Sequence, residues 1–179
     1  LLGGRVELML TGSAPLGVEV QKYVQTVFEC RVRQGYGLTE TCGGATIALA
    51  SDNSTSCVGP PQESACIKLR DWEEGGYRNS DKGLEGVMMR RGEILIGGPA
   101  VCDGYLVDPQ NPDPDIVAKN KEDFVTIDGT RSFVSLNPHP HPHAHTAALH
   151  ASCVTRQPHL IHTTGMRFFC TGDIGQITP

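Results

Sequence analysis

The order strand, helix, strand at the start of the chain restricts the possible folds more than any other feature of the sequence. The run RVELMLTG at 5–12 is short, apolar and followed by a turn, which is typical of a buried strand. A helix is predicted after it, with apolar residues at helical spacing that should pack on a sheet: Leu16, Val20, Tyr23, Val24 and Val27. The run CRVRQGYG at 30–37 predicts the next strand. This β-α-β unit indicates an α/β fold, in which ligands bind beyond the carboxyl ends of the strands.

A second, β-rich part is expected from about residue 58. Short apolar runs such as CIKLRDW at 66–72 and GEILIGGP at 92–99 are separated by glycine and proline turns. This pattern favours a small antiparallel sheet or a distorted barrel over further β-α-β units. The segment DPQNPDPD at 108–115 predicts a surface turn that leads into a short helix from Ile116.

Composition excludes several classes of partner. The net charge of −5, and the absence of any run of Lys and Arg, give no basic face for nucleic acid. No stretch of 18 apolar residues is present, and the first residues lack the pattern of a signal peptide.

The seven cysteines form no C-x-x-C pair, which indicates reduced thiols and an intracellular protein. Cys42 is a candidate nucleophile, but no histidine precedes residue 139 to activate it, so a packing role is favoured.

The segment 130–165 differs sharply from the rest of the chain, since it holds all seven histidines and no Asp, Glu or Lys. Its alternation of Pro and His predicts an extended, disordered tract with little to bury. Imidazoles are good zinc and nickel ligands, so a histidine-rich metal-binding protein is one alternative function. The candidate ligands are His139, His141, His143 and His145. Because the prolines between them restrict the turns needed to wrap an ion, loose metal binding is favoured over a defined site.

Three short motifs carry the functional information through their order: TGSAPLG at 11–17, QGYGLTET at 34–41 and TGD at 171–173. Joined by GEILIGGPAVCDGY at 92–105, they resemble the adenylate-forming (AMP-binding) superfamily, and in particular its long-chain fatty acyl-CoA synthetases. The resemblance implies a fragment of the large N-terminal domain of such an enzyme. Residues 1–57 would end its α/β nucleotide-binding subdomain, while 58–129 and 166–179 would form its β-rich subdomain.

The resemblance also implies a two-step reaction. A fatty acid carboxylate attacks the α-phosphate of ATP to give an acyl-adenylate and pyrophosphate, and coenzyme A then takes the acyl group. Mg²⁺ is expected, because two anions must approach each other. Thr39 and Glu40 correspond to catalytic positions: the Thr39 hydroxyl would contact phosphate, and Glu40 would be the metal ligand.

The remaining expected site residues surround the nucleoside. Tyr36 would offer a flat face to adenine, and glycines on either side would let the backbone approach the base: Gly35 and Gly37. Asp173 matches the acid that accepts hydrogen bonds from both ribose hydroxyls. The wall of the adenine pocket would come from small residues of the first motif: Gly12, Ser13 and Ala14. Taken singly, Tyr36 is more typical of a strand end, Glu40 of a solvated loop and Asp173 of a turn or helix cap, so their roles depend on the joint match.

Family enzymes carry a phosphate loop upstream and a lysine-bearing domain downstream, and neither is found in this sequence. We therefore expect the 179 residues to be inactive alone. A non-catalytic truncated AMP-binding protein, and another adenylate-forming ligase such as a 4-coumarate-CoA-ligase-like enzyme, remain alternatives. The resemblance implies a parent at the endoplasmic reticulum or another organelle membrane, with peripheral attachment possible.

Joining Gly129 to Met166 restores a pattern close to that of the family, TIDGMRFFCTGDIG. The segment 130–165 is therefore interpreted as an insertion, together with 83–90, and both are hypothesised to be non-native, such as translated introns in a gene model.

Overall fold

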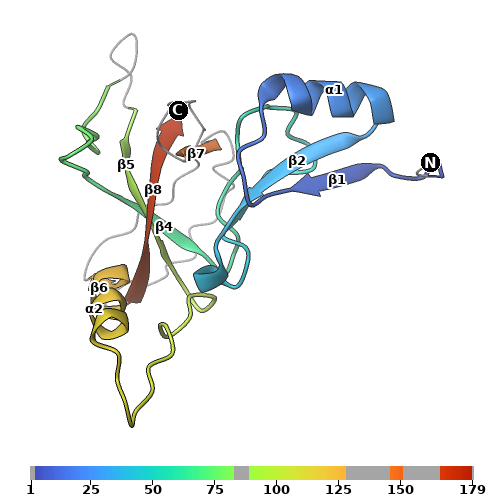
Figure 1. Cartoon of the computed structure of the whole chain (residues 1–179). Coiled ribbons are helices and arrows are strands. Elements are labelled where there is room, and N and C mark those ends of the chain that lie inside the picture. The colour runs from blue at the N-terminus through green and yellow to red at the C-terminus, as the bar shows by residue number, and fades with distance from the viewer. Residues whose placement is uncertain (1–2, 83–88, 128–145, 151–165, 179) are drawn as a thin grey trace.

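The computed structural model describes residues 3–82, 89–127, 146–150 and 166–178, and it confirms the β-α-β unit. Strand β1 (Leu8–Thr11), helix α1 (Val18–Phe28) and strand β2 (Arg31–Tyr36) follow in that order, and β1 pairs parallel with β2 (Figure 1). The short strand β3 (Thr46–Ile47) lies antiparallel on the other side of β2. A single turn of 3-10 helix, Thr39–Thr41, separates β2 from β3.

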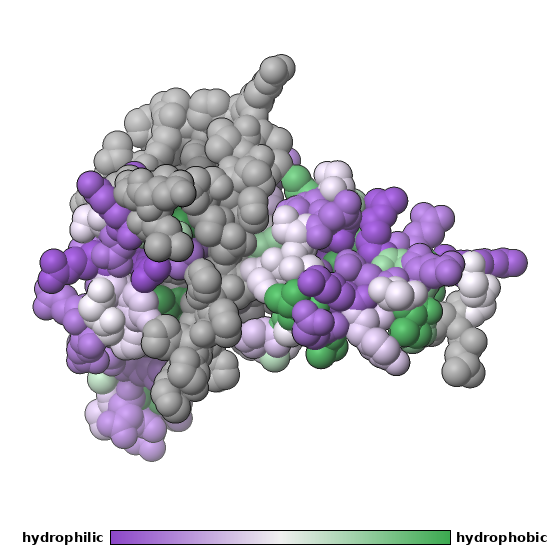
Figure 2. Space-filling view, turned by 90° about the horizontal axis from the view of Figure 1, so that it is seen from above, coloured by the Kyte–Doolittle hydropathy of each residue, from purple (hydrophilic) through white to green (hydrophobic). Residues whose placement is uncertain are grey.

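The prediction that the whole apolar stripe of α1 packs on the sheet is wrong. Val20, Tyr23 and Val27 are 53%, 68% and 52% exposed, and Figure 2 shows apolar surface over this unit. The helix turns Gln21 inward instead, where its amide donates to the Val32 carbonyl and accepts from the Gln34 amide. The three-stranded sheet covers only one side of the helix, whereas the apolar pattern extends around more of it.

The β-rich part is a second sheet, as expected. Its order is β4 (Cys66–Arg70), β5 (Arg91–Gly97), β8 (Met166–Thr178) and β6 (Phe124–Ile127), and each pair in this path is antiparallel. Strand β7 (Thr146–His150) pairs parallel with the end of β8. Helix α2 (Pro114–Asp123) begins two residues before the predicted start, because the Asp113 carboxylate caps it by accepting from the Asp115 amide.

The two sheets share one apolar core. Ile67 and Ile94 lie on the face of the second sheet that meets the chain after β2, and both are essentially inaccessible to solvent. Ala45 and Val58 belong to the same buried cluster as these two isoleucines, and Tyr36 packs against the edge of the cluster. The opposite face of the second sheet has its own cluster, made by Cys66, Leu95, Phe168 and Cys170. This shared core fixes the end of β2 beside β8. Neither of the described helices is long and apolar enough to span a bilayer.

Within the predicted insertion, residues 146–150 form β7, so the expected disorder does not hold for them. The rest of 130–165 lies outside the described residues, as does 83–88 of the shorter segment, and the disorder of that part of 130–165 stays a prediction. The described residues on either side of 130–165 support the insertion hypothesis, because Ile127 at the end of β6 pairs directly with Met166 at the start of β8. Removing 130–165 would leave only Asp128 and Gly129 between these partners. Asp-Gly is a favoured pair for a two-residue turn between antiparallel strands.

We expect a chain that lacks residues 130–165 to fold into the same two sheets. Shortening the connection to a two-residue turn lowers the entropic cost of closing it, by about 2 kcal/mol before the loss of the β7 pairing is counted. Circular dichroism and urea unfolding of the two chains check this. A control in which 130–165 is replaced by a Gly/Ser tract of equal length separates the effect of loop length from that of β7. Loss of cooperative unfolding in the deletion variant alone would contradict the insertion hypothesis.

Candidate functional site

The first two motifs meet at the carboxyl ends of β1 and β2, where a site was predicted. Thr11 and Gln34 are partners in the parallel pairing, so the turns that follow them leave the sheet side by side. A Cβ atom on Gly12 would lie 3.3 Å from the carbonyl oxygen of Gly35, which shows how closely the two segments approach. Gly12, Ser13 and Ala14 are all exposed in this turn. Gly12 thus lies against the end of β2, while the role of all three residues beside adenine stays a prediction.

The loop after β2 is held in a tight form that presents its polar residues. A side chain at Gly37 would place its Cβ 2.6 Å from the Gly43 carbonyl oxygen, so only glycine fits there. Leu38 accepts hydrogen bonds at its carbonyl from the amides of Thr41 and Gly43, at 3.1 and 2.9 Å. As a result, Thr39 is exposed and Glu40 is half-buried at the surface of the loop.

The third motif joins the second through one hydrogen bond. The Tyr36 hydroxyl donates to Oδ2 of Asp173 across 2.6 Å, although the two residues are 137 positions apart in the chain. Burial and, after it, the negative charge of Asp173 raise the pKa of the Tyr36 hydroxyl well above its usual value. The phenol is therefore a neutral donor throughout the physiological pH range. The structure thus brings together Tyr36 of the second motif and Asp173 of the third.

A second tyrosine holds Glu40. The Tyr105 hydroxyl lies 2.7 Å from Oε1 of Glu40 and 3.1 Å from Oδ2 of Asp123. Lys119 Nζ lies 2.9 Å from the same oxygen of Asp123 and offsets its charge. Burial, with the hydrogen bonds to Glu40 and Asp123, raises the pKa of Tyr105 and keeps its proton in place. In the sequence, Tyr105 stands out only as the last residue of the GEILIGGPAVCDGY run, which gives no indication of its bond to Glu40.

The backbone around Tyr105 is fixed by helix α2 and by the loop of Glu40. Asn120 accepts from the Tyr105 amide at 2.7 Å and donates to the Tyr105 carbonyl at 2.9 Å. The Cys102 amide donates to the Glu40 carbonyl at 2.9 Å. The Phe124 ring packs edge-on against Tyr105, with 5.5 Å between ring centroids. Asp123 and Asn120 belong to no recognisable motif, so the sequence held no signal for them, whereas the DGY triplet was a signal for Tyr105.

The donor set around Glu40 suits a metal ion that arrives with a ligand. Within residues 3–82, 89–127, 146–150 and 166–178, no group of three or more His, Cys, Asp or Glu could hold a metal ion. Mg²⁺ is usually bound in nucleotide sites by one or two carboxylates together with phosphate oxygens and water. A half-exposed Glu40 beside the exposed Thr39 hydroxyl fits that arrangement. The histidines at 139–145 lie outside the described part, so that alternative stays a prediction.

Cys42 is exposed at the end of the short helical turn, in contrast to Cys57 and Cys66, which are buried. Burial raises the pKa of the Cys57 and Cys66 thiols, with the charge of Asp52 adding to the effect at Cys57. A raised thiol pKa leaves less of the reactive thiolate at neutral pH.

We therefore expect iodoacetamide at neutral pH to modify Cys42 well before Cys57 and Cys66 in the folded chain. Peptide mass spectrometry after a time course of alkylation measures the three rates. In urea all three thiols should react at similar rates, which serves as the control. Equal protection of Cys42 in the folded chain would show that the loop is not presented as described.

Taken together, the fold and the site define an α/β enzyme domain in which loops from two sheets converge on one polar site. A family model described as "AMP-binding enzyme" matches residues 1–106, which is more than half of the chain. The chain therefore belongs to the AMP-binding enzyme family.

Two individual proteins are similar in sequence to more than half of this chain. The chain is 44% identical over 113 residues to long chain acyl-CoA synthetase 8 of Arabidopsis thaliana, which covers 63% of this chain and 15% of that protein. It is 39% identical over 108 residues to human long-chain-fatty-acid–CoA ligase 1, covering 60% and 14% of the two chains. The chain thus spans about 15% of the length of these relatives.

The fold has a counterpart among solved structures. A crystal structure of a long-chain-fatty-acid–CoA ligase from Archaeoglobus fulgidus superposes with a TM-score of 0.58 at 19% identity, over 94% of this chain and 25% of that chain. At this identity the likeness shows the fold alone. It confirms the predicted class, a β-α-β unit followed by a β-rich part of an adenylate-forming enzyme's N-terminal domain. The roles of individual residues stay predictions.

Proposed function

We propose that this chain forms the nucleoside side of the ATP site in a long-chain fatty acid–CoA ligase. The proposed parent activates a fatty acid with ATP to an acyl-adenylate and transfers it to coenzyme A. The observation that carries the proposal is the hydrogen bond between Tyr36 and Asp173, which joins two distant motifs whose side chains the proposal assigns to adenine and to ribose. The names of the relatives at 44% and 39% identity support the substrate class.

Tyr36 and Asp173 would bind the nucleoside as a pair. The Tyr36 ring would lie against adenine, opposite the turn of Gly12 to Ala14, and its hydroxyl stays engaged with Asp173. A carboxylate has about four lone-pair sites. Asp173 can therefore accept from Tyr36 and still accept from two ribose hydroxyls.

Glu40 and Thr39 would act at the phosphates. Mg²⁺, when bound with ATP, would neutralise phosphate charge that otherwise repels the attacking carboxylate. Tyr105 donates to Oε1 of Glu40 and so restricts the orientation of the carboxylate, whose further lone pairs remain for the metal. The exposed Thr39 hydroxyl would donate to a phosphate oxygen. The expected location of the parent, inside the cell at an organelle membrane, is part of the same proposal.

Nucleotide binding by this chain tests the nucleoside assignment. Replacing Asp173 by Ala should weaken AMP binding by about tenfold to a hundredfold, because hydrogen bonds to a charged group contribute ~1.5–3 kcal/mol. Isothermal titration calorimetry measures the dissociation constants, and Glu74→Gln removes an exposed charge elsewhere as the matched control. Added Mg²⁺ should strengthen ATP binding to the wild type but not to Glu40→Gln. A wild-type chain that binds neither nucleotide would refute the assignment.

Catalytic competence can be tested by grafting. We expect the chain alone to give no fatty-acid-dependent exchange of pyrophosphate into ATP. Residues 1–129 joined to 166–179, placed at the matching positions of the Arabidopsis synthetase, should support exchange, because that protein supplies the remaining segments. The same chimera with Glu40→Gln should lose most of its activity. A non-catalytic AMP-binding protein predicts instead a folded chimera without exchange.

A further inference from the structure

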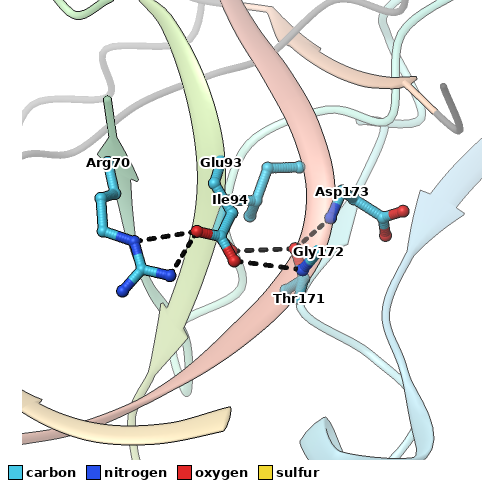
Figure 3. Close-up of polar contacts among 6 residues, drawn as sticks. All are labelled: Arg70, Glu93, Ile94, Thr171, Gly172 and Asp173. Atoms are coloured by element: carbon cyan, nitrogen blue, oxygen red, sulfur yellow. Dashed lines mark hydrogen bonds and ion pairs between the residues drawn. The ribbon is translucent and has the colours of Figure 1, made fainter. Parts of the chain in front are cut away.

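The segment that carries Asp173 is a bulge in β8. Leu95 of β5 pairs with Cys170, and Glu93 pairs with Ile174, so Ile94 alone stands opposite Thr171, Gly172 and Asp173. The extra residues push the TGD segment out of the regular ladder, and Gly172 takes a φ of +70° to allow it. A bulge of this kind redirects a side chain, and here it sends the Asp173 carboxylate toward β2 (Figure 3).

The motif itself provides part of what holds the bulge. The Thr171 hydroxyl donates to the Ile94 carbonyl at 2.9 Å and accepts from the Asp173 amide at 3.0 Å. The first bond ties the bulge to the middle of β5, and the second links the two ends of the bulge to each other. They leave the Gly172 amide, at the tip of the bulge, to be satisfied by a group outside the motif.

Glu93 supplies that group. Its Oε1 accepts from the Gly172 amide at 3.3 Å, and its Oε2 accepts from Nε of Arg70 at 2.8 Å and also from Nη2. Figure 3 shows the carboxylate lying between the guanidinium of β4 and the backbone of β8. The Glu93 side chain is only 14% exposed, whereas that of Arg70 is 49% exposed. A largely buried carboxylate depends strongly on its partners, so Arg70 and the Gly172 amide fix the orientation of Glu93.

The bulge is therefore fixed from two directions. Glu93 holds its backbone on one side of β8, and Tyr36 holds the Asp173 carboxylate on the other, at 2.6 Å. Neither contact involves the reacting phosphates. Both determine where the carboxylate of Asp173 lies before any ligand arrives, and a displacement of the bulge would move its oxygens away from the ribose.

We propose that Glu93, oriented by Arg70, is a positioning residue that aligns Asp173 with the two ribose hydroxyls of the bound nucleotide. The inference rests on the proposed nucleotide-binding function, and it gives Glu93 and Arg70 a role that none of the motifs indicated. Glu93 acts through Asp173 and does not touch the ligand. Removing it should therefore weaken recognition of the ribose hydroxyls while leaving contacts with the base and the metal unchanged.

The test compares AMP with 2′,3′-dideoxy-AMP by calorimetry on the folded chain. The wild type should bind AMP about tenfold to a hundredfold more tightly, because the analogue lacks both hydroxyls. Glu93→Ala should reduce that ratio to less than about threefold, mainly by weakening AMP binding. Glu93→Gln keeps an acceptor for the Gly172 amide and should retain an intermediate ratio. Arg70→Met should act in the same direction as Glu93→Ala, with a smaller effect.

Controls separate positioning from general destabilisation. Ile67→Val trims a buried residue of β4 and lowers stability without touching the bulge, so it should keep the wild-type ratio. The strengthening of ATP binding by Mg²⁺ should also be unchanged in Glu93→Ala. Equal weakening of AMP and its dideoxy analogue, or an unchanged ratio in folded Glu93→Ala and Glu93→Gln, would overturn the inference. A wild-type chain that binds no AMP, or does not discriminate the two ligands, would instead refute the proposed function, and the inference with it.

Discussion

The apolar core shared by the two sheets is the constraint on which the site depends. Ile94 and Ile67 are almost completely buried, and Ala45, just before β3, belongs to the same buried cluster. Interiors of this kind are close-packed, so one sheet cannot slide over the other without opening a cavity. Tyr36 lies on the edge of this core. The packing therefore brings the end of β2 within hydrogen-bond distance of Asp173 on β8.

Two carboxylates of the site each accept a hydrogen bond from a tyrosine hydroxyl. A tyrosine hydroxyl donates to Asp173 at one end of the site, and another donates to Glu40 at the other. In both tyrosines, burial and the neighbouring carboxylates raise the phenol pKa, which keeps the donor protonated. Each carboxylate is thus oriented before ligand binds. Such preorganisation lowers the reorganisation needed when a ligand binds.

Much of the fold could be predicted, because it follows from local pattern, and the β-α-β unit and the change to a β-rich part are confirmed. The structure brings Tyr36 and Asp173 together, while the roles given to the site residues stay predictions. The exposure of the apolar residues of α1, and the contacts of Tyr105 and Glu93, were not predicted. Burial of a helix face depends on how much sheet lies beneath it. Contacts of single side chains depend on partners that are distant in sequence and carry no repeat or spacing.

The sequence by itself determined the alternation of elements, the glycines that permit close approach, and the family to which the chain belongs, since these depend on residue type and order along the chain. Only the tertiary structure decided that TGD forms a bulge, that Glu93 and Arg70 hold it, and that Tyr105 binds Glu40. The reason is physical: strand register and side-chain direction are set by packing between elements. A shift of one residue in that register would turn the side chains of Arg70 and Glu93 to the other face of the sheet.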